Sequence, residues 1–139
     1  MKSKLIVSVE FGETDPAAIV FYPNFFRWFD ASAWRLFAKA GLTFDVFREE
    51  FGLIGAPIVD AQATFIKPLR FEDKIEITSY VGSWKRKTFD MVHEVRRDGE
   101  LCAKGVEVRV CAQRLEDGSG GIRAIPIPEE IRRQLSAAD

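Results

Sequence analysis

Two aspartates near the start of the chain are candidates for a functional site, and the first of them has the setting for acyl-transfer chemistry. The first, Asp15, precedes a proline, which disfavours helical backbone, so we expect it on a loop. That loop leads to the start of a helix, where free backbone N–H groups can hold an anion. A carboxylate beside such donors can attack an acyl carbonyl, or activate water, while an N–H group holds the oxyanion. The alternative is an Asx turn in which Asp15 bonds only its own backbone.

The second aspartate, Asp30, falls at the edge of the apolar side of this helix. The helix is predicted between a start signal at Pro23 and a stop signal at Gly41. At about 100° per residue, one arc collects Phe26, Phe29, Ala33, Leu36, Phe37 and Ala40. Asp30 projects between Trp34 and Phe37. Because burying an unpaired carboxylate is expensive, Asp30 must bind a partner group, stay solvated in a crevice, or contact a ligand.

The elements that must position these residues follow from the hydrophobic pattern. A strand is expected over Leu5 to Phe11, and a second helix over Thr43 to Phe51, closed by Gly52. From Ile58 onward the apolar period changes to two, with a hairpin signal at Asp98-Gly99, an edge strand near 122–127 and a terminal helix after Pro128. We therefore predict an α+β domain, with one apolar helix against one face of an antiparallel sheet.

Two later strands carry polar residues of interest. His93 shares the parity of Phe89, Met91 and Val95, which predicts a packed, hydrogen-bonded histidine. In the next strand, alternating valines are separated by Glu107 and Arg109. The cysteines, Cys102 and Cys111, are an odd number of positions apart, which predicts opposite strand faces and no disulfide between them.

Composition limits the class of protein. With 139 residues and 47% hydrophobic content, residues 1–139 are expected to form a single domain. The 20 basic and 21 acidic residues nearly balance, so no overall field attracts nucleic acid or an anionic membrane. One histidine and no paired Cys/His spacing argue against a metal site. Without a signal-peptide or membrane-span pattern, a cytoplasmic location is the simplest expectation.

Two further groups have both a structural and a functional interpretation. The run at Trp84 to Lys87 is either a solvated turn or a site for phosphate groups. The aromatic residues near the first helix either pack in the core or line a flat slot for a ring; they are Phe21, Phe25, Trp28 and Trp34.

Sequence blocks over nearly the whole chain match one family pattern. They are Phe11-Gly12, Asp15-Pro16-Ala17, Ile19-Val20, Tyr22-Pro23-Asn24, Arg27-Trp28, Asp30, Gly55, Pro57-Ile58-Val59, Phe65, Asp73, Trp84, Arg86-Lys87 and Arg123-Ala124-Ile125. In these blocks the chain resembles the 4-hydroxybenzoyl-CoA thioesterase family of hotdog-fold enzymes. The resemblance implies a long central helix wrapped by an antiparallel sheet, and an acyl-CoA substrate without a cofactor. It also implies active sites between subunits of a homodimer, with dimers commonly pairing into tetramers.

The resemblance also implies roles for individual residues. Asp15 would be the catalytic carboxylate, and the backbone N–H of Tyr22 the oxyanion donor. Asp30 would contact the hydroxyl group of the acyl ring, with Phe21 and Phe25 beside the ring. The CoA phosphates would bind Lys85, Arg86 and Lys87.

The chain departs from the family pattern at three positions. Ala18 replaces a glycine, so a positive φ cannot be assumed there. Phe26 replaces a polar aromatic residue, and Ala56 a hydroxyl residue. We therefore expect a thioesterase for an aromatic acyl-CoA such as 4-hydroxybenzoyl-CoA. The alternatives are a thioesterase for short-chain aliphatic acyl-CoA or acyl-carrier protein, and a non-catalytic acyl-CoA-binding hotdog protein.

Overall fold

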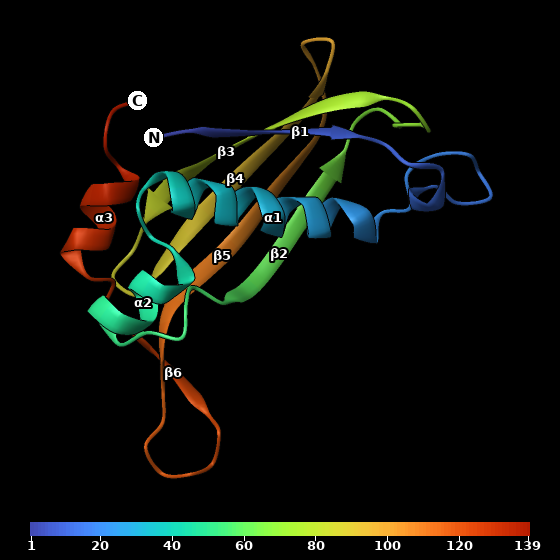
Figure 1. The fold of residues 1–139 in the computed structure, drawn as a ribbon. Helices are drawn as coiled ribbons and strands as arrows, with labels where there is room; N and C mark the ends of the chain where they lie inside the picture. Colours follow the sequence, from blue (N-terminus) through green and yellow to red (C-terminus); the bar gives the residue numbers. More distant parts are fainter.

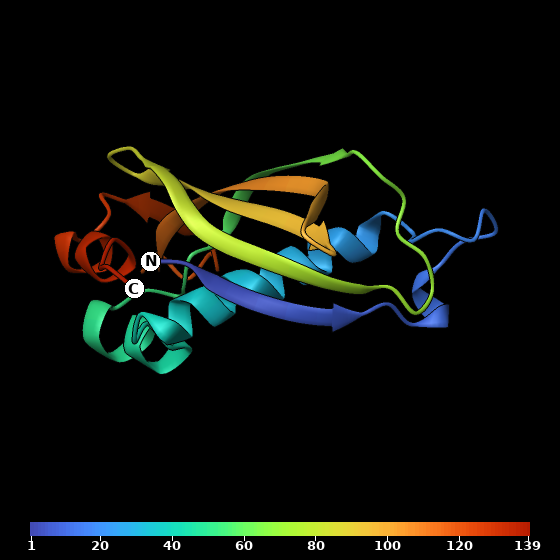
Figure 2. The same cartoon turned by 90° about the horizontal axis from the view of Figure 1, so that it is seen from above.

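The computed structural model, which describes residues 1–139, has one antiparallel sheet that curves around a long helix (Figures 1 and 2). The helix is α1, Pro23–Lys39, and the main path of the sheet runs β1-β3-β4-β5-β2, with β6 paired to β5. The strands are β1 Ser3–Ser8, β2 Ile58–Phe65, β3 Lys74–Trp84, β4 Thr88–Arg97, β5 Glu100–Arg114 and β6 Ile122–Ile125. The predicted α+β architecture is confirmed.

The ends of α1 lie where the local signals predict them, but its buried face is broader. Pro23 occupies the first turn, and Gly41 follows the last with φ 78°. Phe25 and Trp28 are buried, whereas Phe26, which the projection placed on the apolar arc, is only half-buried. The physical reason is that α1 contacts β1, β3 and β4 together, so the curved sheet covers more than one stripe of the helix.

The shorter elements also follow the sequence. The helix α2, Phe44–Phe51, is capped by the side chain of Thr43 and ends at Gly52 in the left-handed region. Asp98 and Gly99 both have positive φ, as a two-residue hairpin turn requires. The last helix is α3, Glu129–Leu135. None of these helices has the length and apolar content to cross a membrane.

The face of β5 that packs against α1 carries Glu107 and Arg109 rather than Val106 and Val108. A Cβ atom on Gly105 would lie 2.3 Å from the ring of Phe29, so the odd-numbered side of β5 faces the helix. Glu107 and Arg109 are on that side and are buried, while Val106 and Val108 are partly exposed. The period of two is therefore present, and the inward side is the polar one.

The cysteines do not pair, but their predicted arrangement is wrong. Cys102 and Cys111 are both free and fully buried, in two core clusters to which α1 contributes. The ladder between β4 and β5 shifts register next to Cys102, between the pairs Val95↔Ala103 and Arg96↔Leu101. This bulge interrupts the regular alternation on which the opposite-face prediction rested.

Candidate active site

Asp15 lies in a tight loop just before α1. An antiparallel bridge joins Thr14 to Val20, and the N–H of Asp15 donates to the carbonyl of Ile19 at 2.9 Å. Within the loop, the N–H of Ala18 donates to the carbonyl of Asp15 at 2.8 Å. Ala18 adopts φ 62°, so this alanine does hold the left-handed backbone conformation for which glycine is usually required.

The two carboxylate oxygens of Asp15 have different surroundings. Oδ1 accepts a hydrogen bond from the N–H of Ala17 at 2.8 Å, the contact expected of an Asx turn. Oδ2 has no partner within the chain. The structural interpretation of Asp15 therefore holds for one oxygen, which orients the carboxylate and leaves the other free for chemistry.

Glu13 attaches this loop to α1, a role that the sequence analysis missed. Its carboxylate accepts hydrogen bonds from Arg27 at 2.6 Å and from Trp28 Nε1 at 3.2 Å. It also accepts one from the N–H of Glu10 at 2.8 Å. Nothing in the local sequence distinguishes Glu13 from Glu10; only the fold brings Glu13 against the first turns of the helix, where it is 9% exposed.

Asp15 and the start of α1 form one side of a cleft of about 390 Å³. Tyr22 and Phe25 lie on this side, and the end of β2 with the following segment forms the other side. The lining is mainly apolar and includes Ile19, Val20, Phe65, Ile66, Lys67, Pro68 and Leu69. The cleft thus joins two segments that are distant in the sequence around one carboxylate.

The backbone N–H of Tyr22 is the free donor at the start of α1. Pro23 has no N–H, and the N–H groups of Asn24 and Phe25 donate to the carbonyls of Phe21 and Tyr22. The Tyr22 N–H makes no hydrogen bond within the chain. A free donor and a free carboxylate oxygen therefore belong to residues of the same cleft, the pair of groups that acyl transfer needs.

The aromatic candidates separate into three environments. Phe25 lines the cleft, whereas Phe21 is 50% exposed and is not part of its lining. Trp28 is buried and bonded to Glu13, and Trp34 packs against a core cluster. The core interpretation therefore fits Trp28, and neither tryptophan lines the cleft.

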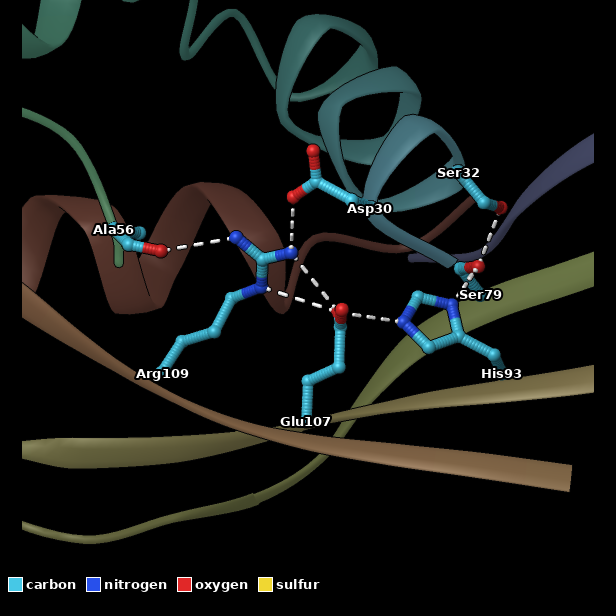
Figure 3. Close-up of polar contacts among 7 residues, drawn as sticks. All are labelled: Asp30, Ser32, Ala56, Ser79, His93, Glu107 and Arg109. Atoms are coloured by element: carbon cyan, nitrogen blue, oxygen red, sulfur yellow. Dashed lines mark hydrogen bonds and ion pairs between the residues drawn. The ribbon is translucent and has the colours of Figure 1, made fainter. Parts of the chain in front are cut away.

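Asp30 lies outside this cleft and binds a buried arginine (Figure 3). Arg109 Nη2 donates to Asp30 Oδ1 at 2.9 Å, and the Asp30 side chain is 50% exposed while that of Arg109 is 2% exposed. Asp30 thus has the partner that its position at the edge of the apolar arc demanded. The partner itself, Arg109, was missed by the sequence analysis; its only signal was a charge within an apolar strand.

Behind Arg109, polar side chains continue across the sheet (Figure 3). Glu107 Oε1 accepts from Arg109 Nη2 at 2.9 Å and bonds His93 Nε2 at 2.8 Å. His93 Nδ1 bonds Ser79 Oγ at 2.6 Å, and Ser79 bonds Ser32 Oγ at 2.6 Å. His93 is fully buried and stacked on Phe29, so the prediction of a packed, hydrogen-bonded histidine is confirmed.

The pKa of Glu107 reflects these partners. Burial alone would raise the pKa of its carboxyl, but the hydrogen bond from His93 and the charge of Arg109 outweigh burial and hold it below its ordinary value. Glu107 is therefore an anion at neutral pH, matched to the cation beside it.

The basic turn lies far from Asp15 in the same chain. Lys85, Arg86 and Lys87 are exposed between β3 and β4, next to α3, whereas the Asp15 loop is at the opposite end of the sheet in both ribbon views (Figures 1 and 2). The side chain of Arg132 donates to the carbonyls of Lys85 and Arg86. The backbone of the basic turn is therefore fixed by hydrogen bonds from α3, which carries Arg132.

Comparisons with known proteins agree with this architecture. The family model described as the thioesterase-like superfamily matches residues 9–135. The 4-hydroxybenzoyl-CoA thioesterase of Pseudomonas sp. (strain CBS-3) is 37% identical over 130 residues, covering 88% of this chain and 89% of the relative.

Solved structures show the same similarity. An aspartate-to-asparagine variant of 4-hydroxybenzoyl-CoA thioesterase complexed with 4-hydroxybenzoyl-CoA superposes with a TM-score of 0.88 at 34% identity, over 97% of this chain and 99% of that one. A gentisyl-coenzyme A thioesterase superposes with a TM-score of 0.79 at 30% identity, over 97% and 100% of the two chains. The chain therefore belongs to the thioesterase-like superfamily and, within it, to the 4-hydroxybenzoyl-CoA thioesterase family of hotdog-fold acyl-CoA thioesterases.

Proposed function

We propose that this enzyme hydrolyses the thioester of an aromatic acyl-CoA such as 4-hydroxybenzoyl-CoA, with Asp15 as the catalytic carboxylate. The observation that carries the proposal is that Asp15 Oδ2 and the Tyr22 N–H, both without partners in the chain, belong to one mainly apolar cleft. The N–H would donate to the carbonyl oxygen as it gains negative charge.

Asp15 has two possible roles in the same geometry. As nucleophile, Oδ2 attacks the acyl carbon, the C–S bond breaks, and the CoA thiolate departs. The product is an anhydride between Asp15 and the acyl group, which water then cleaves. As general base, Oδ2 takes a proton from a water whose oxygen attacks the acyl carbon directly, and the C–S bond then breaks to release the free acid and the CoA thiolate. In both cases the hydrogen bond from Ala17 to Oδ1 keeps the carboxylate oriented.

The aromatic acyl group is supported by the lining of the cleft and by the relatives. Phe25 and Phe65, whose ring centroids lie 4.9 Å apart, both line the cleft and offer faces on which a flat ring can pack. The two relatives described above are named for 4-hydroxybenzoyl-CoA and gentisyl-CoA. The ring of a hydroxylated aromatic acyl group would pack against this apolar lining, and its hydroxyl group would need a polar acceptor at the far end of the ring.

We further propose that a second copy of the chain completes the site along β2. This strand ends the sheet, and Ile58, Val59 and Phe65 on it are 40%, 59% and 49% exposed, an unpaired apolar edge that favours pairing. Antiparallel pairing of two such edges about a two-fold axis near the middle of β2 sets the Ile58 end of one chain beside the Phe65 end of the other. Phe65 lines the Asp15 cleft.

This pairing would bring Asp30 to the cleft of the partner. Asp30 binds Arg109, which is the ladder partner of Ile58, so it lies at the end of β2 that would meet the other copy's cleft. There its carboxylate would accept a hydrogen bond from the ring hydroxyl of the substrate. Phe21, which is exposed near the cleft rather than part of its lining, would contact substrate only in such an assembly.

The CoA phosphates are assigned to the basic turn, again from another copy. Lys85, Arg86 and Lys87 follow an 11-residue strand, which spans about 33 Å of sheet from the end near the Asp15 loop. That distance favours a role for the turn at the cleft of a different chain, in a dimer or in a dimer of dimers.

Asp15→Asn tests the reaction. The asparagine keeps an acceptor for Ala17 but cannot attack or take a proton, so we expect kcat to fall on the order of 10²- to 10⁴-fold with KM little changed. The measurement is thiol release from 4-hydroxybenzoyl-, benzoyl-, phenylacetyl- and butyryl-CoA, with Asp45→Asn, an exposed aspartate in α2, as the matched control.

Each alternative has its own outcome in the same assay. Turnover of Asp15→Asn close to that of the unmodified enzyme would exclude the proposed mechanism. Preference for butyryl-CoA would indicate a short-chain thioesterase. Binding of the esters without thiol release would indicate a non-catalytic acyl-CoA-binding protein.

Subunit mixing tests the shared site. If Asp15 and Asp30 of different chains act together, co-refolded Asp15→Asn and Asp30→Ala chains should regain roughly a quarter of the 4-hydroxybenzoyl-CoA turnover, because half of the dimers are hybrids and each hybrid has one intact site. If both aspartates of a site came from one chain, mixing would restore nothing. Light scattering on the same samples would report the size of the assembly.

A further inference from the structure

Asp30 is held by one of its two carboxylate oxygens. Oδ1 accepts the hydrogen bond from Arg109 Nη2, whereas Oδ2 points away from Arg109 and has no partner within the chain (Figure 3). Since the side chain is 50% exposed, Oδ2 is accessible from outside the core. Asp30 therefore combines a fixed orientation with a free acceptor.

The guanidinium of Arg109 is held by contacts on several sides. Its Nε and Nη2 donate to Glu107 Oε1 at 3.3 and 2.9 Å, and its Nη1 donates to the carbonyl of Ala56 at 2.9 Å. The guanidinium also lies 5.6 Å from the centroid of the Phe37 ring. A planar group held on three sides can present its remaining Nη2–H in one direction only, which a flexible lysine could not do.

The hydrogen bonds behind Arg109 return to the helix that carries Asp30. Glu107 on β5 bonds His93 on β4, His93 bonds Ser79 on β3, and Ser79 bonds Ser32 on α1. A neutral imidazole satisfies this chain, since Nε2–H donates to Glu107 while Nδ1 accepts from the Ser79 hydroxyl. The polar contacts thus run from Asp30 on α1 through three strands and return to α1 at Ser32, two residues after Asp30.

We propose that Arg109 is a positioning residue for substrate selection: with Glu107 and His93 behind it, it holds Asp30 so that Oδ2 meets the ring hydroxyl of an aromatic acyl group. This inference rests on the proposed function, because it needs a hydroxylated aromatic substrate. Arg109 itself touches neither the thioester nor the CoA. Its contribution should appear in the discrimination between a hydroxylated ring and one without a hydroxyl group.

The expected effect follows from one hydrogen bond to a charged group. Arg109→Lys keeps the positive charge but loses the planar guanidinium with its several N–H donors, so the Asp30 carboxylate becomes free to rotate. The ratio of kcat/KM for 4-hydroxybenzoyl-CoA over benzoyl-CoA should fall about ten- to hundredfold. Turnover of benzoyl-CoA, which makes no contact with Asp30, should change much less, whereas a general structural defect would lower both substrates together.

The experiment measures this ratio in four enzymes: unmodified, Arg109→Lys, Asp30→Ala and the double variant. If Arg109 acts through Asp30, the double variant should have the ratio of Asp30→Ala alone. The matched control is Arg96→Lys, which alters an arginine paired with Glu94 on the neighbouring strand. Should Arg109→Lys fail to fold by circular dichroism, Glu107→Gln, which loosens the guanidinium at constant side-chain volume, replaces it with the same expected loss of the ratio.

The results that would overturn the inference distinguish the positioning role from the proposed substrate. If the ratio is high in the unmodified enzyme and stays high in Arg109→Lys, the positioning role is rejected and the proposed substrate stands. The same holds if adding Arg109→Lys to Asp30→Ala lowers the ratio by the same factor as Arg109→Lys alone. A ratio near one in the unmodified enzyme rejects the hydroxylated substrate, and the positioning role with it.

Discussion

Two Glu-x-Arg pairs on neighbouring strands face opposite sides of the sheet. On β4, Glu94 and Arg96 pair at 3.0 Å with side chains 20% and 35% exposed. On β5, Glu107 and Arg109 pair at 2.9 Å and both are 2% exposed. The same residue types at the same spacing thus form a surface ion pair in one strand and the support of a buried aspartate contact in the next.

The difference comes from the neighbours of each pair. Glu94 also accepts a hydrogen bond from Tyr80 and lies beside Lys104 of β5, on the side of the sheet that solvent reaches. Glu107 and Arg109 follow the parity of Gly105, which faces α1, so they leave water completely and need replacement partners. Buried charges are tolerated when each has several hydrogen bonds, and removing one member leaves the others uncompensated. Charge spacing therefore indicates which residues can pair, whereas packing decides how much the pair contributes to stability.

Removing the carboxylates should give the largest contrast. Glu107→Leu leaves Arg109 and His93 without their common acceptor, so we expect the free energy of unfolding to fall by about 3–5 kcal/mol. The matched change Glu94→Leu, on the exposed side, should cost no more than about 1 kcal/mol. Urea unfolding followed by circular dichroism measures both. Similar losses in the two variants would show that burial does not separate the pairs.

The pH dependence of stability should show a smaller contrast of the same sign. In both glutamates burial raises the pKa, but hydrogen bonds and nearby cations outweigh it, so the folded pKa lies below the ordinary value of 4.5. The stabilisation from such a group is fully present above pH 4.5 and is lost as the pH falls through the folded pKa.

This sign can be measured with variants that cannot ionise. The stability difference between the unmodified enzyme and Glu107→Gln should therefore shrink as the pH is lowered from about 7 to about 3, and that for Glu94→Gln should shrink less, because solvent screens the outer pair. Unfolding midpoints across this range provide the test. A difference for Glu107→Gln that stays constant or grows on acidification would contradict the assigned direction of its pKa.

Much of the fold could be predicted because its signals are local. Pro23 marks the start of α1 and Gly41 follows its end, and Thr43 and Gly52 cap the two ends of α2. The positive φ angles of Asp98 and Gly99 form the hairpin turn. Each of these depends on one residue's own backbone preference or on a hydrogen bond within a single turn. The period of two in the strands is equally local, since it follows from the pleat.

The candidate site was predictable in part. Asp15 is on the loop that its proline requires, and Asp30 has the partner that its place on the helix demands. Glu13, Glu107 and Arg109 were missed, because a charged residue in an apolar segment does not reveal whether it meets water or another charge. Phe65 entered the site only when the sheet brought the end of β2 against the start of α1.

Local sequence signals are enough to predict the helices, the turns, the strand period and the two aspartates that needed an explanation. Packing between distant elements sets which side of β5 is buried, which arginine meets Asp30, and which distant segment closes the Asp15 cleft. The reason is physical: caps and turns are satisfied within a few residues, whereas the cost of burying a charge depends on partners that other elements supply. Here the side of β5 that carries Gly105 also carries Glu107 and Arg109 and faces α1. Asp30 accepts a hydrogen bond from Arg109, and His93 bonds Glu107.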